Sequence, residues 1–161
     1  MRQFAFICGP INLLRFCNVV LMKITSVLGF DYGKKRIGIA TGQTITNSAT
    51  PCKTISQVNG NPDWPAIEAE IKQWKPQALI VGIPYYTDGS ESQMTSAVRQ
   101  FCYELEKRFK LPVIEVNETL SSQQAEELLK TNMKINKHNK HEIDKMAAAI
   151  IVQRWLDQHS P

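Results

Sequence analysis

The stretch SVLGFDYGKKRIGIAT, residues 26–41, decides the fold. Its first half is a short apolar run that ends at Asp31-Tyr32-Gly33, and a second apolar run extends from Arg36 to Thr41. Short apolar runs that are bounded by Gly are typical of buried strands. Because only Gly33-Lys34-Lys35 separates the two runs, they predict an antiparallel hairpin.

The rest of the chain alternates between helical and strand patterns. A weaker third strand, Thr50 to Ile55, extends the hairpin into a meander. The later patterns predict helices over 63–74, 92–109, 121–129 and 142–156, and strands over 78–82 and 112–117. This order predicts an α/β fold, a mixed five-stranded sheet flanked by helices, whose later strands are parallel and joined by right-handed crossovers. Trp64, Trp74 and Trp155 have helical spacing and are expected in the core.

Length and composition narrow the class of protein. The chain has 161 residues, of which 43% are hydrophobic and 21% charged, as in an ordinary globular domain. A single domain is expected, which argues against an actin-like ATPase built from two related domains. The net charge of +4 permits contact with nucleic acid but does not demonstrate it. The four cysteines are far apart and include no CxxC, which argues against a structural zinc site.

Residues 1–21 differ from the rest of the chain. Their apolar run is interrupted by Gly9-Pro10, so they predict neither a membrane span nor a signal peptide. Met22 leads directly into the first strand. Two alternatives therefore remain open: an extension that starts at Met1, or translation from Met22, with residues 22–161 forming the single domain in both cases.

Three acidic residues are the candidates for chemistry. Asp31 ends the first strand, Glu118 follows the fifth, and Asp144 begins the last helix on the same helix face as Ala148 and Ile151. Ligand sites in α/β sheets lie beyond the carboxyl ends of the parallel strands. Carboxylates that meet there repel one another unless divalent cations neutralise them, and hard oxygen ligands suit Mg²⁺ or Mn²⁺. The arrangement favours metal-assisted hydrolysis of phosphodiesters.

Each acid also has a structural explanation. Asp31 could order the turn at Gly33, Glu118 could be solvated, and Asp144 could favour the positive end of its helix. The residue pattern by itself leaves these alternatives open.

Four blocks of sequence together resemble one family. They are LGFDYGKKRIGIA (28–40), IVGIP (80–84) with DGS (88–90), NETLSS (117–122) and IDKMAA (143–148). In this order they resemble the motifs of the YqgF family, Holliday junction resolvase-like proteins that are also regarded as pre-16S rRNA nucleases. The resemblance extends from about Ile24 to Leu156 and leaves out the residues before Met22.

The resemblance implies a ribonuclease H-like fold, a cytoplasmic location and a nuclease role in maturing the 5′ end of 16S ribosomal RNA. It implies that Asp31, Glu118 and Asp144 are the catalytic and metal-binding acids. One block departs from the family pattern, which usually reads Asp-Glu-Arg before the helix. In this chain Asn117 stands in place of the Asp, and Thr119 stands in place of the Arg. An Asn offers a carbonyl to a metal but brings no charge, so the departure puts metal affinity and substrate binding in doubt.

Basic and aromatic residues are candidates for substrate binding. Lys34, Lys35 and Arg36 are next to the expected site and are predicted to bind phosphate. Tyr85 and Tyr86 follow a strand, where their rings could stack on an unpaired base or cover the sheet. A second basic stretch leads into the last helix; its lysines are Lys130, Lys134, Lys137, Lys140 and Lys145.

The partner is therefore expected to be nucleic acid, with pre-rRNA favoured over branched DNA and with ribosomal particles as a further partner. A Holliday junction resolvase and a non-catalytic nucleic-acid-binding module remain alternative functions. The sequence leaves open whether the chain is a monomer or a homodimer.

Overall fold

A computed structural model describes residues 24–86, 88–118 and 140–159. The described elements follow one another as a meander, two strand-helix alternations and a long last helix. They are β1 (Ser26–Tyr32), β2 (Arg36–Gln43), β3 (Ser48–Val58), β4 (Asn61–Pro62), α2 (Trp64–Trp74), β5 (Ala78–Ile83), α3 (Gln93–Phe109), β6 (Val113–Asn117) and α5 (Lys140–His159). The helix expected over 121–129 lies outside the described residues.

The described strands form one mixed sheet with the order β4-β3-β2-β1-β5-β6. β1, β2 and β3 are antiparallel neighbours, while β5 runs parallel to both β1 and β6. The mixed sheet is thus confirmed, but it has six strands rather than five. The extra strand, Asn61–Pro62, pairs with the end of β3 across a tight turn at Asn59-Gly60, where both residues have positive φ. Two residues are too few to give a strand pattern in the sequence.

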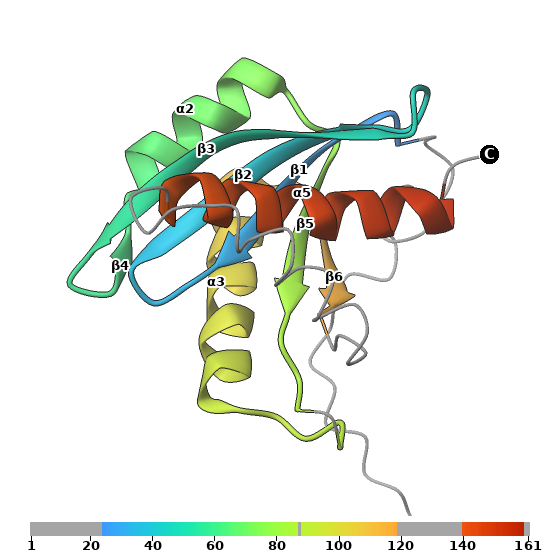
Figure 1. Ribbon diagram of the computed structural model, residues 1–161. Helices are drawn as coiled ribbons and strands as arrows, with labels where there is room; N and C mark the ends of the chain where they lie inside the picture. Colours follow the sequence, from blue (N-terminus) through green and yellow to red (C-terminus); the bar gives the residue numbers. More distant parts are fainter. Residues whose placement is uncertain (1–23, 87, 119–139, 160–161) are drawn as a thin grey trace, which may run out of the picture.

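Helices cover both faces of the sheet, and each face has its own core (Figure 1). α5 crosses one face, where Ala148, Val152 and Leu156 are buried against the sheet. α2 and α3 pack on the other face, where Phe30 and Phe101 meet edge to face with ring centroids 5.8 Å apart. None of the described helices is long and apolar enough to cross a membrane.

Local capping sets where α2 and α3 begin. The Asp63 side chain accepts a hydrogen bond from Ala66 N at 3.1 Å, so α2 begins one residue later than expected. Ser92 caps α3 in the same way, in a capping box with Thr95. α5 begins at Lys140 rather than Glu142 and runs to His159.

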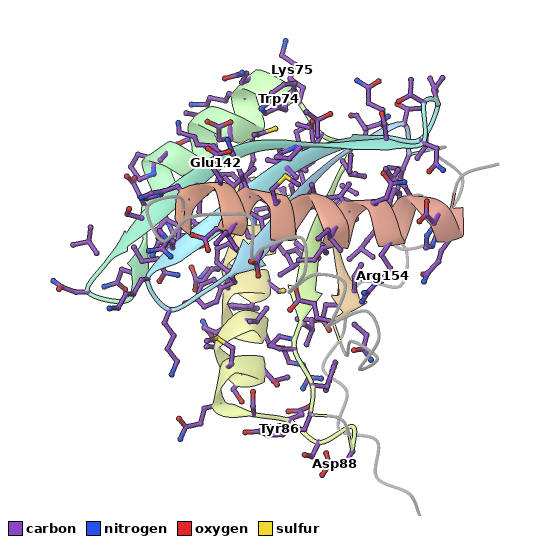
Figure 2. All side chains as sticks on the ribbon, in the orientation of Figure 1. Trp74, Lys75, Tyr86, Asp88, Glu142 and Arg154 are labelled. Atoms are coloured by element: carbon purple, nitrogen blue, oxygen red, sulfur yellow. The ribbon has the colours of Figure 1, made fainter. Side chains whose placement is uncertain are left out.

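The expectation that Trp74 lies in the core is wrong. Trp74 is 41% exposed at the end of α2 (Figure 2). The buried residue on its side of the helix is instead Glu70, which accepts hydrogen bonds from Trp74 Nε1 at 3.2 Å and from Lys53 Nζ at 2.9 Å. A charged residue can replace an apolar one here because both of its oxygens have partners.

Candidate active site

The acids Asp31 and Glu118 are positioned by three parallel strands. β1, β5 and β6 lie side by side, so their carboxyl ends share one edge of the sheet. Asp31 is the second-last residue of β1, and Glu118 directly follows β6. The backbone N–H of Glu118 donates to the carbonyl of Ile83 at 2.9 Å, which fixes Glu118 beside the end of β5. The edge therefore carries one acid on each side of β5.

Gly38 brings the third acid to this edge. It is the cross-strand partner of Asp31 in the hairpin. A Cβ at Gly38 would lie 1.9 Å from the carbonyl oxygen of Asp144, closer than any two such atoms can approach. Only glycine at this position lets the first turns of α5 rest on β2. The helix therefore holds Asp144 over the strand pair that carries Asp31.

Gly82 makes room for the Glu118 side chain. It lies on β5, between β1 and β6, where a Cβ would be 1.9 Å from Glu118 Oε1. The carboxylate therefore occupies the space where any other residue would place its side chain. Gly38 and Gly82 thus each make room for one of the acids.

The electrostatics of the site reflect these positions. Burial raises the pKa of Asp31 to about 6, and the nearby charge of Asp144 adds to the effect. Burial raises the pKa of Glu118 to about 7, with a further contribution from Asp31, while the charge of Arg154 acts in the opposite direction. Asp31 thus interacts electrostatically with both other acids, so the structure brings the three acids to one edge of the sheet.

Arg36 has a different partner from the one expected. Predicted to bind phosphate, it donates from Nε to Asp144 Oδ2, and the two side chains are 26% and 22% exposed. Lys34 and Lys35 are exposed in the adjoining turn. No group of three or more His, Cys, Asp or Glu side chains in residues 24–86, 88–118 and 140–159 is arranged to hold a metal ion.

Arg154 is a site residue that the sequence analysis missed. Its Nη1 donates to the carbonyl oxygen of Asn117 at 2.8 Å, and its charge lowers the pKa of Glu118 against the effect of burial. The sequence did contain a signal for it. Arg154 comes three residues after Ile151, and this spacing places it at the margin of the buried face of α5. Asn117, which replaces the family's acid, is exposed. Thr119 lies outside the described residues.

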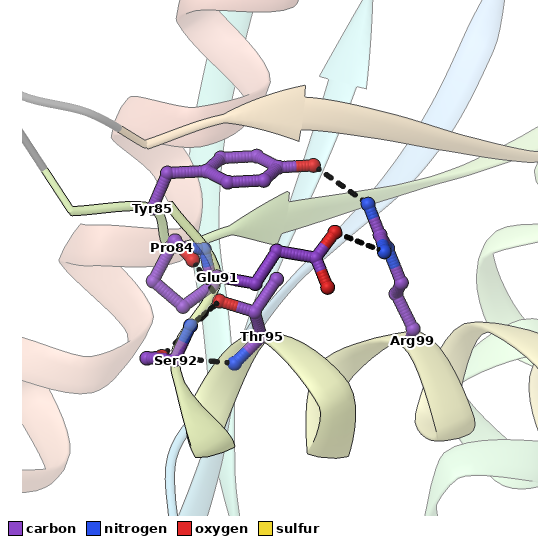
Figure 3. Close-up of polar contacts among 6 residues, drawn as sticks. All are labelled: Pro84, Tyr85, Glu91, Ser92, Thr95 and Arg99. Carbon is purple, nitrogen blue, oxygen red and sulfur yellow. Dashed lines mark hydrogen bonds and ion pairs between the residues drawn. The ribbon is translucent and has the colours of Figure 1, made fainter. Parts of the chain in front are cut away.

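The two tyrosines after β5 have different surroundings. The Tyr85 hydroxyl accepts a hydrogen bond from Arg99 Nη2 at 3.1 Å, and Arg99 also pairs with Glu91 (Figure 3). Tyr85 therefore ties the loop to α3, which favours the interpretation that its ring covers the sheet. Tyr86 is 57% exposed, so for this ring the interpretation that it stacks on an unpaired base stays a prediction.

The fold, with acids at its carboxyl edge, is that of the ribonuclease H-like class. RuvC of Thermus thermophilus, solved with a Holliday junction substrate, has a TM-score of 0.50 at 10% identity over 83% of this chain and 94% of its own. The fowlpox virus resolvase, solved with Holliday junction DNA, has a TM-score of 0.52 at 12% identity over 83% of this chain and 98% of its own. At such identities the likeness concerns the fold alone.

Sequence relatives are much closer. A protein of Legionella pneumophila (strain Philadelphia 1) named "Putative pre-16S rRNA nuclease" is 48% identical over 81% of this chain and 94% of its own length. A protein of the same name from Pseudomonas fluorescens (strain Pf0-1) is 40% identical over 86% and 97%. The model of the RuvX family, described as Holliday junction resolvase, matches residues 25–158. The chain belongs to this family, which confirms the resemblance carried by the four motifs.

Proposed function

We propose that the chain is a metal-dependent nuclease that hydrolyses phosphodiester bonds in the cytoplasm and matures the 5′ end of pre-16S rRNA. The observation that carries the proposal is the pair of partly buried acids, Asp31 and Glu118, whose pKa values are raised to about 6 and about 7 beside a third acid. Carboxylates that are buried together without a neutralising cation are destabilised, which is typical of a site that binds one. The names of the relatives supply the substrate.

The donor chemistry fits a hard divalent cation. Asp31, Glu118 and Asp144 would hold Mg²⁺ or Mn²⁺ through carboxylate oxygens. When bound, such an ion stabilises negative charge on the phosphate and activates water for attack. Asp144 becomes available as a ligand once it leaves Arg36.

The basic side chains of the site provide a physical basis for the release of Asp144 from Arg36. The Arg36 guanidinium is bound to Asp144 in a partly exposed pair, and a substrate phosphate competes for the same hydrogen-bond donors. Transfer of Arg36 from carboxylate to phosphate would bind the substrate and free the third acid in one step. Lys34 and Lys35 would hold neighbouring phosphates from the turn.

The test is a cleavage assay with two labelled substrates, a 16S precursor 5′ fragment and a DNA four-way junction. Each is incubated with Mg²⁺, Mn²⁺ or EDTA and with the parent chain or Asp31→Asn. We expect metal-dependent cleavage of the precursor that the variant loses. Cleavage of the junction alone would instead support a resolvase, the activity in the family's description. Binding without any cleavage would overturn the proposal in favour of a non-catalytic module.

A further inference from the structure

A cavity lies on the opposite face of the sheet from the three acids. Its volume is about 300 Å³, and it lies between the tips of two hairpins and the first turns of α3. The residues that line it are Tyr32, Lys34, Gln57, Gly60, Gln93, Met94 and Ala97. Its volume is at the small end of the range for ligand pockets, which suits a single ring system rather than an extended ligand.

The walls of the cavity combine aromatic, apolar and polar groups. Tyr32 packs on Phe101 with ring centroids 4.9 Å apart, so its ring is held in place. Met94 and Ala97 are partly buried and contribute apolar surface from α3. An oriented ring with apolar surface beside it is the usual environment for an unpaired base.

Gln57 provides a hydrogen-bonding group in the same wall. Its Nε2 donates to the carbonyl oxygen of Gly33 at 2.6 Å, which fixes the orientation of the amide. Its Oε1 is buried and, within the described residues, has no hydrogen-bond partner. A buried acceptor without a donor is costly, and most such groups in folded proteins are satisfied. A ligand N–H that reaches this wall would satisfy it.

Positive charge lies at one side of the cavity. Lys34 is exposed in the β1–β2 turn, and the cavity adjoins the first turn of α3, where the helix dipole is positive. Both features favour an anionic group such as phosphate. Together with the ring and the orphan acceptor, they match a nucleotide better than a neutral ligand.

The position of the cavity links it to the site at the acids. Asp31 and Tyr32 are neighbours in β1, so their side chains point to opposite faces of the sheet. The turn of residues 33–35 connects the two faces, and its lysines are exposed. A strand whose phosphates follow this turn would have one nucleotide near the acids and another near the cavity.

We propose that this cavity binds one unpaired nucleotide of the substrate strand, with its base against Tyr32 and Met94 and its phosphate at Lys34. The proposal rests on the proposed nuclease function for its choice of ligand. It adds a binding site, away from the acids, that selects single-stranded over paired substrate, because a paired base cannot enter the cavity.

The first experiment measures binding in EDTA, where a metal-dependent nuclease does not cleave. The probes are a short fluorescent single-stranded RNA, the matching DNA strand and the RNA duplex. Ala97→Phe fills the cavity, while Ser96→Phe adds the same ring at the adjacent exposed position of α3 and serves as the matched control. We expect Ala97→Phe to weaken single-strand binding roughly tenfold or more, which is the effect of losing one stacked base. Ser96→Phe should stay within about twofold.

The second experiment needs no substitution and therefore does not depend on how Ala97→Phe folds. The parent chain is titrated with nucleoside monophosphates and followed by ¹H–¹⁵N NMR. The Gln57 side-chain amide and the backbone amides of Met94 and Ala97 should shift together and saturate. Shifts confined to other residues, or equal RNA affinity of parent and folded Ala97→Phe, would overturn the proposal.

The outcomes separate this proposal from the proposed function. One outcome is metal-dependent cleavage that Asp31→Asn abolishes, together with no effect of Ala97→Phe on binding. This outcome would refute nucleotide binding in the cavity and support the nuclease function. Saturable NMR shifts at the cavity without cleavage of any substrate would keep the nucleotide site and refute the nuclease.

Discussion

The two faces of the sheet are built from different kinds of residue. The face under α2 and α3 is filled by large side chains, among them Phe30, Leu105 and Phe101. The face under α5 has glycines in the strands, and at Gly38 and Gly82 any side chain would collide with the backbone of Asp144 or the carboxylate of Glu118. Large side chains maximise buried apolar area, whereas glycines let charged groups approach the sheet closely. The first face mainly stabilises the fold, and the second gives up packing to hold the site.

The largest expected effect concerns the site on the α5 face. Asp31→Asn removes the charge of a proposed metal ligand and should lower the cleavage rate at least about 10³-fold, equivalent to about 4 kcal/mol. The same change removes a carboxylate whose pKa is raised by burial, so thermal unfolding should shift to higher temperature. Single-turnover cleavage and calorimetry measure the two effects. A variant that loses activity and stability together would contradict the division between the faces.

The next effect concerns the opposite face. Phe101→Ala empties a position that contacts Phe30, Tyr32 and Trp64, and truncations of buried Phe cost about 3–5 kcal/mol. The free energy of unfolding from urea denaturation should fall by this amount. At saturating substrate, cleavage by the fraction that remains folded should stay near the parent rate, because Phe101 packs on the face opposite the acids. Substrate affinity should weaken, because Tyr32 loses the ring that holds it in place. A specific loss of cleavage in folded protein would show that the faces are coupled.

A smaller effect tests the glycine contact itself. Gly38→Ala places a Cβ 1.9 Å from Asp144 O, so α5 must shift away from β2. We expect a loss of about 2–3 kcal/mol of stability, as for other overpacked sites, together with a drop in cleavage. Gly89→Ala is the control, because a Cβ there would meet no atom of the described residues within 4 Å and its cost comes from a positive φ of 80°. Equal activity of both variants would refute the role assigned to Gly38.

Much of the fold was predictable because it depends on local pattern. The hairpin of residues 26–41, the buried run of β5 and the apolar stripes of α3 and α5 are confirmed close to their expected bounds. The presence of acids at one sheet edge was also predictable from the sequence, because parallel strands align their carboxyl ends. Their roles as ligands stay a prediction.

The parts that were not predictable depend on pairing between distant segments. The contact of Arg36 with Asp144 joins residues 108 positions apart. The partners of Glu70, and hence the exposure of Trp74, depend on where Lys53 falls on β3. That register shifts at a bulge between Ile39 and Ala40, which no local pattern announces. The cavity at Gln57 depends on the same register.

The smallest expected effect is the pH dependence of stability without metal. The folded state raises the pKa of Asp31 to about 6 and of Glu118 to about 7, so it binds protons that the unfolded chain has released. These groups therefore cost no stability below their ordinary pKa values. The loss accumulates as the pH rises from those values to about 6 for Asp31 and about 7 for Glu118, and it is complete above them. Because the two acids interact, we expect a combined loss of about 1–2 kcal/mol between pH 5 and pH 8.

Thermal unfolding in EDTA at the two pH values measures this loss, with Asp31→Asn as the comparison. The variant should lose less stability over the same range, because one of the two raised groups is gone and the other no longer faces its charge. Addition of Mg²⁺ should restore stability at pH 8 more than at pH 5, since cations bind the ionised carboxylates and compete with protons. Phe101→Ala should keep the full pH dependence of the parent, because its face carries none of these acids. If instead the Phe101 variant lost the pH dependence and Asp31→Asn kept it, the instability would belong to the packed face, and the division between the two faces would be wrong.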